Sequence, residues 1–190
     1  MGPTGYAGGT YSCVKNGGAP VASNSISLAP GDNATCTINN DDIAPSLTLI
    51  KQVNNTHGGT ATANLWTLTA TGTVGSPTNL SGNTPVSSGA NFKADTYALS
   101  ETGEPSGYTA SQYSCVKNSS APVIGNSITL GVGDTATCTI TNDDNSPSLT
   151  LVKVVDNDDG GTATANQWTL TATGPTGFSG PGPSVSNGAS

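Results

Sequence analysis

A lysine, a glutamate and an asparagine each stand at the end of an apolar, alternating segment, and these three residue types can together form a covalent bond. Side chains two apart in a strand share a face, so Lys51, Glu101 and Asn142 each continue an inward-facing apolar row. The rows are Leu47 and Leu49, then Tyr97 and Leu99, then Ala136, Cys138 and Ile140.

Burial of these three groups would make them reactive. Desolvation removes the proton from an amine and keeps it on a carboxylic acid. A neutral Lys51 can then attack the side-chain carbonyl of Asn142 while a protonated Glu101 polarises that carbonyl and carries protons. Ammonia leaves, an isopeptide bond remains, and fixed proximity removes roughly 7 to 11 kcal/mol of the barrier. The alternative is purely structural: at strand ends a lysine can extend its amine to solvent and a glutamate can stay solvated.

An internal repeat organises the chain around these segments. Tyr11–Asn16 returns as Tyr113–Asn118, an offset of 113 − 11 = 102, and Trp66–Gly72 returns as Trp168–Gly174 at the same offset. We therefore divide the chain into residues 1–43, the C-terminal part of one repeat, residues 44–145, a complete repeat, and residues 146–190, the N-terminal part of a third. The partial repeats carry the counterparts Asn40 and Lys153.

The pattern within the complete repeat predicts an all-β fold of tandem antiparallel β-sandwich domains. Gly, Thr, Ser and Asn are abundant and no helical period is visible. Strands are expected at residues 47–53, 65–71, 96–101, 110–116, 127–130 and 135–141. Parity places Trp66 and Trp168 in the core, and the acidic residues after each Cys-Thr-Ile strand are expected to form solvated linkers.

Composition excludes several functions. Five Lys and Arg residues and a net charge of −7 cannot form a basic patch, so nucleic acid is excluded as a partner. No stretch is apolar for long enough to insert in a membrane. The only histidine, His57, lies in a Gly-rich turn and is read as an exposed loop residue. We expect no metal, no cofactor and no turnover catalysis, so the chain is not an enzyme.

The cysteines occur as one pair per repeat with equal spacing. Cys13 and Cys36 are separated by 36 − 13 = 23 positions, and Cys115 and Cys138 by 138 − 115 = 23. This pairing favours one disulfide within each repeat of an extracellular protein. Closing such a loop stabilises by about 3 kcal/mol in the chain-entropy model.

Three motifs carry a family resemblance. They are Leu-Thr-Leu-x-Lys at residues 47–51, Tyr-x-Leu-x-Glu-Thr-Gly-x-Pro-x-Gly-Tyr at 97–108 and Cys-Thr-Ile-x-Asn-Asp-Asp at 138–144. Together they resemble the prealbumin-like, Ig-like repeats related to Cna type B and SpaA domains of bacterial surface adhesins and pilins. The resemblance implies that Lys51 and Asn142 are joined under the influence of Glu101.

The predicted function is structural. Repetition, short linkers and cross-links suit a stiff, secreted stalk or extracellular filament segment at the cell surface, whose partners are neighbouring copies or repeats arranged head to tail. The alternative is an adhesin or ligand-binding module of a larger secreted protein. We expect the segment to be a window of a longer repetitive polypeptide rather than a self-assembling subunit.

Overall fold

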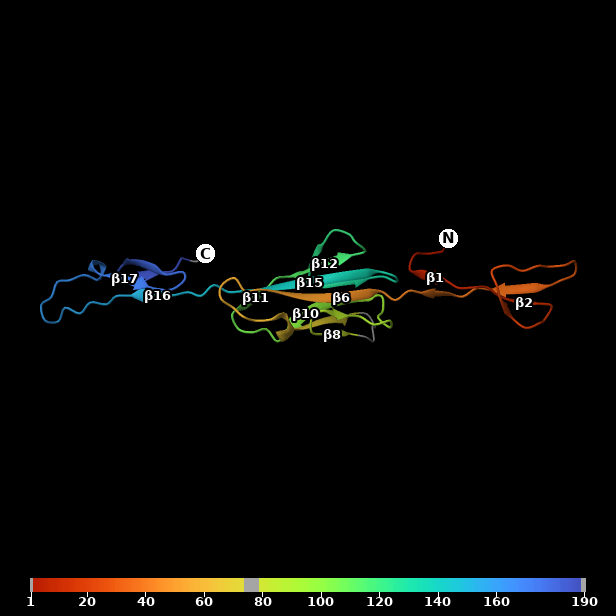
Figure 1. The fold of residues 1–190 in the computed structure, drawn as a ribbon, viewed down its shortest axis with the longest axis horizontal. Coiled ribbons are helices and arrows are strands. Elements are labelled where there is room, and N and C mark those ends of the chain that lie inside the picture. Colours follow the sequence, from red (N-terminus) through yellow and green to blue (C-terminus); the bar gives the residue numbers. More distant parts are fainter. Residues whose placement is uncertain (1, 74–78, 189–190) are drawn as a thin grey trace. The chain divides into compact units, whose positions relative to one another are not determined.

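The structure is a computed structural model that describes residues 2–73 and 79–188, and nearly all its regular structure is β-strand (Figure 1). Contacts divide the chain into two compact units, which are described separately below. The first contains Met1–Asn55 and Thr60–Asp143, and the second contains Thr56–Gly59 and Asp144–Ser190.

A two-layer β-sandwich occupies the part of the first unit that follows residue 45. One sheet has the strand order β14 (Ser127–Leu130), β10 (Asp95–Thr102), β7 (Thr67–Gly72) and β8 (Leu80–Gly82). The other has the order β13 (Val123–Gly125), β12 (Tyr113–Lys117), β15 (Thr135–Asp144), β6 (Ser46–Asn54) and β9 (Val86–Ser87), and β11 (Tyr108–Ala110) also pairs with β15. The all-β prediction is thus confirmed.

The pairing of β6 with β15 differs from the antiparallel pairing of β12 with β15 and of β6 with β9. β6 and β15, the first and last long strands of this region, run parallel and lie side by side in Figure 1. Parallel strands need a long connection, and the whole of the intervening chain supplies it. β6 and β15, which are far apart in the sequence, are therefore adjacent in the middle of one sheet.

The core forms between the two sheets because alternate residues of each long strand point inward. Burial alternates along β6 and along β15, as the apolar pattern predicts. The inward side chains form one apolar cluster that includes Leu47, Leu49, Leu68, Tyr97, Leu99, Tyr113, Cys138 and Ile140. Trp66 is fully buried, as predicted.

Several element boundaries differ from those predicted. A 3₁₀ turn, η1 (Ala63–Leu65), precedes β7, so this strand begins at Thr67. β15 continues through Asp144, which shortens the expected linker. The strand predicted at residues 110–116 is divided between the end of β11 and β12. The short strands β8, β9 and β13 were not predicted, because segments of two or three residues are too short to show alternation.

The N-terminal part of the first unit contains two small sheets. β1 (Tyr6–Gly8) pairs with β5 (Asn40–Asp42), and a second sheet has the order β3 (Val21–Ala22), β2 (Ser12–Lys15) and β4 (Ala34–Thr37).

The second unit contains two strand pairs and a 3₁₀ turn, η2. The pairs are β16 (Thr150–Val152) with β19 (Ser184–Ser186) and β17 (Thr169–Ala172) with β18 (Phe178–Pro181); η2 is Ala165–Gln167. The prediction of a buried Trp168 is wrong, because this side chain is 39% exposed. Trp66, its counterpart in the first unit, is covered by Tyr108 in an edge-to-face contact.

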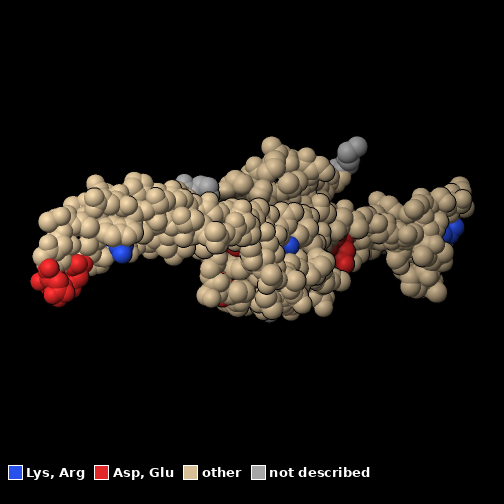
Figure 2. Space-filling view, turned by 60° about the vertical axis from the view of Figure 1, so that its left-hand side comes forward, with Lys and Arg blue, Asp and Glu red and all other residues tan. Residues whose placement is uncertain are grey.

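Charged side chains are sparse over the face shown in Figure 2. Most of this surface consists of uncharged residues, in agreement with the composition. Among the described residues, no helix is long and apolar enough to cross a membrane.

Candidate functional site

The parallel pairing of β6 and β15 positions two of the three predicted site residues. Lys51 is in register with Ile140, and Asn142 is in register with Val53. Residues in register share a face in a sheet, and Asn142 lies two positions after Ile140 on the same inward row of β15. Lys51 and Asn142 are therefore diagonal neighbours on the inward face. Neither side chain reaches solvent to a significant extent, since Lys51 and Asn142 are both buried.

Glu101 reaches these two residues from the opposite sheet. It lies near the end of β10, paired with Leu68 of β7, and its side chain is only 9% exposed. Glu101 Oε2 lies 2.7 Å from Lys51 Nζ. The same Nζ donates a hydrogen bond to Asn142 Oδ1. The structure therefore brings Lys51, Glu101 and Asn142 together in one buried cluster.

The environment of Lys51 lowers the pKa of its amine and so shifts the amine toward the neutral form. Burial lowers the pKa of the amine, and the hydrogen bond and negative charge of Glu101, with the charge of Glu104, oppose this effect without cancelling it. The Trp66 ring covers another side of the amine, with its centroid 4.6 Å from Nζ. Burial, followed by the Glu101 charge, also raises the pKa of the nearby Tyr113 hydroxyl. A neutral amine beside an amide carbonyl is a nucleophile beside an electrophile.

Two contributors to the site were not predicted as site residues. The Asn142 Nδ2 group donates a hydrogen bond of 3.1 Å to Glu104 Oε1, so the amide has partners on both its oxygen and its nitrogen. Glu104 stands three positions after Glu101 in the segment Glu101–Tyr108. This short separation is the sequence feature that could have indicated Glu104 as a site residue. Trp66 was assigned to the core, and no feature of the sequence placed its ring against the amine.

The candidate residues of the partial repeats lie in less protected surroundings. Asn40, on β5, is exposed, and its Oδ1 accepts a hydrogen bond from the Gly9 amide. Lys153 follows β16, and its Nζ lies 4.8 Å from the Trp168 ring centroid. The lysine-over-tryptophan arrangement thus recurs in the second unit at the predicted repeat offset.

All four cysteines form disulfides in the structure. Cys13 pairs with Cys36 and Cys115 with Cys138. In each pair the two residues lie directly opposite each other on neighbouring antiparallel strands. Cys138 stands between Ala136 and Ile140 on the inward row of β15, and is fully buried.

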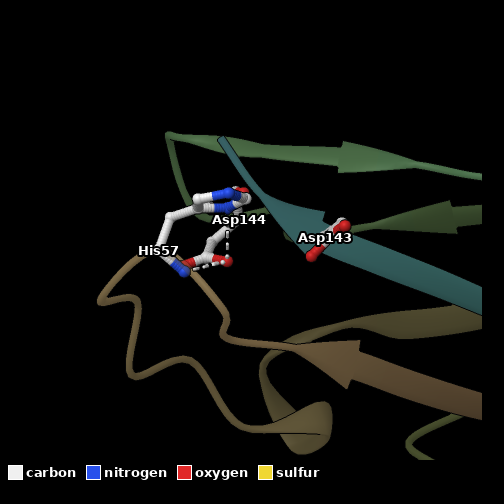
Figure 3. Close-up of side chains that lie close together, drawn as sticks. All are labelled: His57, Asp143 and Asp144. Atoms are coloured by element: carbon white, nitrogen blue, oxygen red, sulfur yellow. Dashed lines mark hydrogen bonds and ion pairs between the residues drawn. The ribbon is translucent and has the colours of Figure 1, made fainter. Parts of the chain in front are cut away.

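Asp144 does not remain solvated as the linker interpretation expected. It is only 5% exposed, and its carboxylate accepts hydrogen bonds from the backbone amides of Thr56, His57 and Gly59. His57 Nδ1 lies 2.8 Å from the Asp144 carbonyl oxygen (Figure 3). Burial favours the neutral acid, but these amides and the His57 charge outweigh it and lower the Asp144 pKa. The Asp144 carboxylate oxygens, which could otherwise bind a metal ion, are thus already engaged by backbone amides.

Comparison with known proteins identifies the family. The model of the prealbumin-like fold domain matches residues 1–38, 42–140 and 144–190, so the chain belongs to this family of SpaA-type domains. No curated protein sequence matches the chain.

Solved structures similar to this chain include major pilins of Streptococcus pyogenes. One is 14% identical, with 76% of this chain and 64% of that chain covered and a TM-score of 0.44. Another is 17% identical, with 74% of this chain and 64% of that chain covered and a TM-score of 0.34. This chain thus spans less than two thirds of the length of those pilins.

Proposed function

We propose that the chain is a structural repeat segment of a secreted bacterial cell-surface stalk or extracellular filament, cross-linked internally. Residues 1–43, 44–145 and 146–190 are its partial, complete and partial repeats, and its partners are neighbouring repeats or copies arranged head to tail. The buried contact of Lys51 with Glu101 and Asn142 is the observation that carries this proposal. Membership of the prealbumin-like family and the two disulfides support an extracellular, non-enzymatic role.

Lys51 and Asn142 form an isopeptide bond in this proposal. Lys51 transfers a proton to Glu101 across their 2.7 Å contact, which leaves a neutral amine and a neutral acid. Nζ attacks Asn142 Cγ while the Glu101 acid polarises the carbonyl. Glu101 Oε1 is buried and has no hydrogen-bond partner, so the acid can carry its proton on this oxygen and donate it to the Asn142 carbonyl. The reaction occurs once in each domain and releases ammonia.

The position of this bond suits a load-bearing role. Lys51 lies on the first long strand of the sandwich and Asn142 on the last. A covalent link between them lets tension pass from the start to the end of the repeat without crossing residues 52–141. Most of the sandwich is then protected from mechanical unfolding, because its strands no longer lie in the force path.

Intact-mass analysis of the purified chain tests the bond directly. After reduction of the disulfides, we expect a mass lower than that of the sequence by one ammonia, and a single cross-linked peptide containing Lys51 and Asn142 after proteolysis. The Glu101→Ala variant should have the full mass calculated from its own sequence, with no loss of ammonia. A full mass in the wild-type protein would refute the cross-link.

Electron microscopy of the native assembly tests the filament. Beaded filaments with a regular repeat are expected. Isolated particles that bind a surface ligand would instead favour the adhesin alternative.

A further inference from the structure

Glu104 is an exposed residue whose carboxylate contacts the buried amide of Asn142. Its Oε1 accepts the hydrogen bond from Asn142 Nδ2 at 3.1 Å, while Lys51 Nζ contacts the other end of the amide, at Oδ1. Asn142 is fully buried, whereas Glu104 is exposed at the surface. The carboxylate therefore connects the amide nitrogen with solvent.

The turn before Glu104 holds it in this position. Gly103 has a φ of +85°, and a Cβ atom at this residue would lie 2.7 Å from the Leu65 carbonyl oxygen. The backbone between Glu101 and Glu104 thus packs directly against the residue before Trp66. On the two sides of this turn, Glu101 contacts the Lys51 amine and Glu104 contacts the Asn142 amide nitrogen.

We propose that Glu104 is a second acid–base residue of the isopeptide reaction, which holds Asn142 Nδ2 and delivers the proton with which this nitrogen leaves as ammonia. This inference rests on the isopeptide bond proposed above. It assigns different tasks to the two carboxylates: Glu101 serves the attacking nitrogen and the carbonyl oxygen, and Glu104 serves the leaving nitrogen.

The proton count explains the need for the second group. Nζ forms the bond to Cγ, Oδ1 receives the proton of Glu101, and Glu101 then removes the surplus proton from Nζ. The former amide nitrogen is now a basic amine attached to a tetrahedral carbon. Glu104, protonated from water, transfers its proton to Nδ2, the Cγ–Nδ2 bond breaks, and the electron pair leaves with the nitrogen as ammonia.

The remaining proton completes the balance. As the carbonyl forms again, Oδ1 loses its proton to water, which offsets the proton that Glu104 took from water. Glu101 ends as the neutral acid it was before the attack. Two neutral groups, an amine and a primary amide, have become one secondary amide and ammonia.

The substitution Glu104→Gln separates proton delivery from simple positioning. Glutamine keeps an oxygen that accepts the hydrogen bond from Asn142 Nδ2, but its amide is not an acid at physiological pH. The wild-type chain and the variant are synthesised in a cell-free system and quenched in denaturant at intervals. The fraction that has lost one ammonia is then measured by intact mass. We expect bond formation in Glu104→Gln to be slower by about 100-fold, a typical effect of losing a general acid, with partial recovery in Glu104→Asp.

Two controls define the outcomes. Asp143→Asn removes an exposed carboxylate from the opposite face of β15 and should react at the wild-type rate. Glu101→Gln should not react. If Glu104→Gln reacts as fast as wild type, the role of Glu104 is refuted and the isopeptide bond stands. If the wild-type chain itself never loses ammonia, the proposed function fails, and the role of Glu104 with it.

Discussion

The Lys51 amine lies against the face of the Trp66 ring, with Nζ 4.6 Å from the ring centroid. Trp66 immediately precedes β7, in the sheet opposite Lys51, and is itself fully buried. The ring excludes water from one side of the amine, while Glu101 and Asn142 occupy others. Desolvation of this kind is the dominant cause of the lowered Lys51 pKa.

Replacement of Trp66 should therefore affect stability and bond formation together. Trp66→Leu leaves a cavity and admits water to the amine. We expect a loss of about 3 kcal/mol in the free energy of unfolding and slower loss of ammonia in time-resolved mass spectra. Trp66→Phe, which retains a ring, is the matched control and should react faster than the leucine variant. Equal rates in the two variants would show that the aromatic face has no role.

The Cys115–Cys138 disulfide should contribute substantially to the stability of the sandwich. The double substitution Cys115→Ala and Cys138→Ala should lower the free energy of unfolding by about 3 kcal/mol, measured by denaturant titration. The matched pair Cys13→Ala and Cys36→Ala should leave the unfolding of residues 44–145 unchanged. Thiol labelling in denaturant should detect no cysteine before reduction, and four labelled cysteines without reductant would contradict both disulfides.

Asp144 should make the 56–59 loop sensitive to acid. Its pKa lies below the ordinary value of 3.8, so its stabilising effect is complete above that pH and is lost as the pH falls through the lowered pKa. Amide hydrogen exchange of Thr56, His57 and Gly59 should accelerate as the pH falls below 3.8, after correction for intrinsic exchange. In Asp144→Asn the same amides should exchange faster at neutral pH and show less dependence on acid. The exposed neighbour provides the control, because Asp143→Asn should retain the wild-type profile.

Two glycines in the segment Glu101–Tyr108 offer a matched test of the turn. Gly103 and Gly107 have nearly equal φ values of +85° and +86°, but only Gly103 lacks room for a Cβ atom. Gly107→Ala should cost about 1 to 2 kcal/mol, the backbone penalty alone. Gly103→Ala should cost clearly more and should slow bond formation, because it displaces Glu104. Equal unfolding midpoints for the two variants would contradict the close approach to Leu65.

The sequence alone determined the strand faces and the repeat. Alternation along residues 47–53 and 135–141 assigns each side chain to one of two faces by geometry, so Lys51 and Asn142 could be placed on inward rows without knowing the partner strands. The repeat offset likewise paired the cysteines and located the counterparts Asn40 and Lys153. These inferences depend only on local periodicity and self-similarity, which a single chain displays.

Tertiary structure decided which inward residues meet. The parallel register of β6 and β15 makes Lys51 and Asn142 diagonal neighbours, and packing of the second sheet brings Glu101 and Trp66 onto them; neither relation has a local sequence signal. The burial of Asp144 also has no local sequence signal. The sequence predicts a solvated linker at this residue, but its carboxylate accepts a hydrogen bond from Gly59, 85 residues away. Trp168 was predicted to be buried and is exposed. A side chain on an inward row becomes buried only where another element covers it. Burial and reactivity depend on contacts between distant segments, whereas the side of the sheet to which a side chain points depends only on its position in the strand.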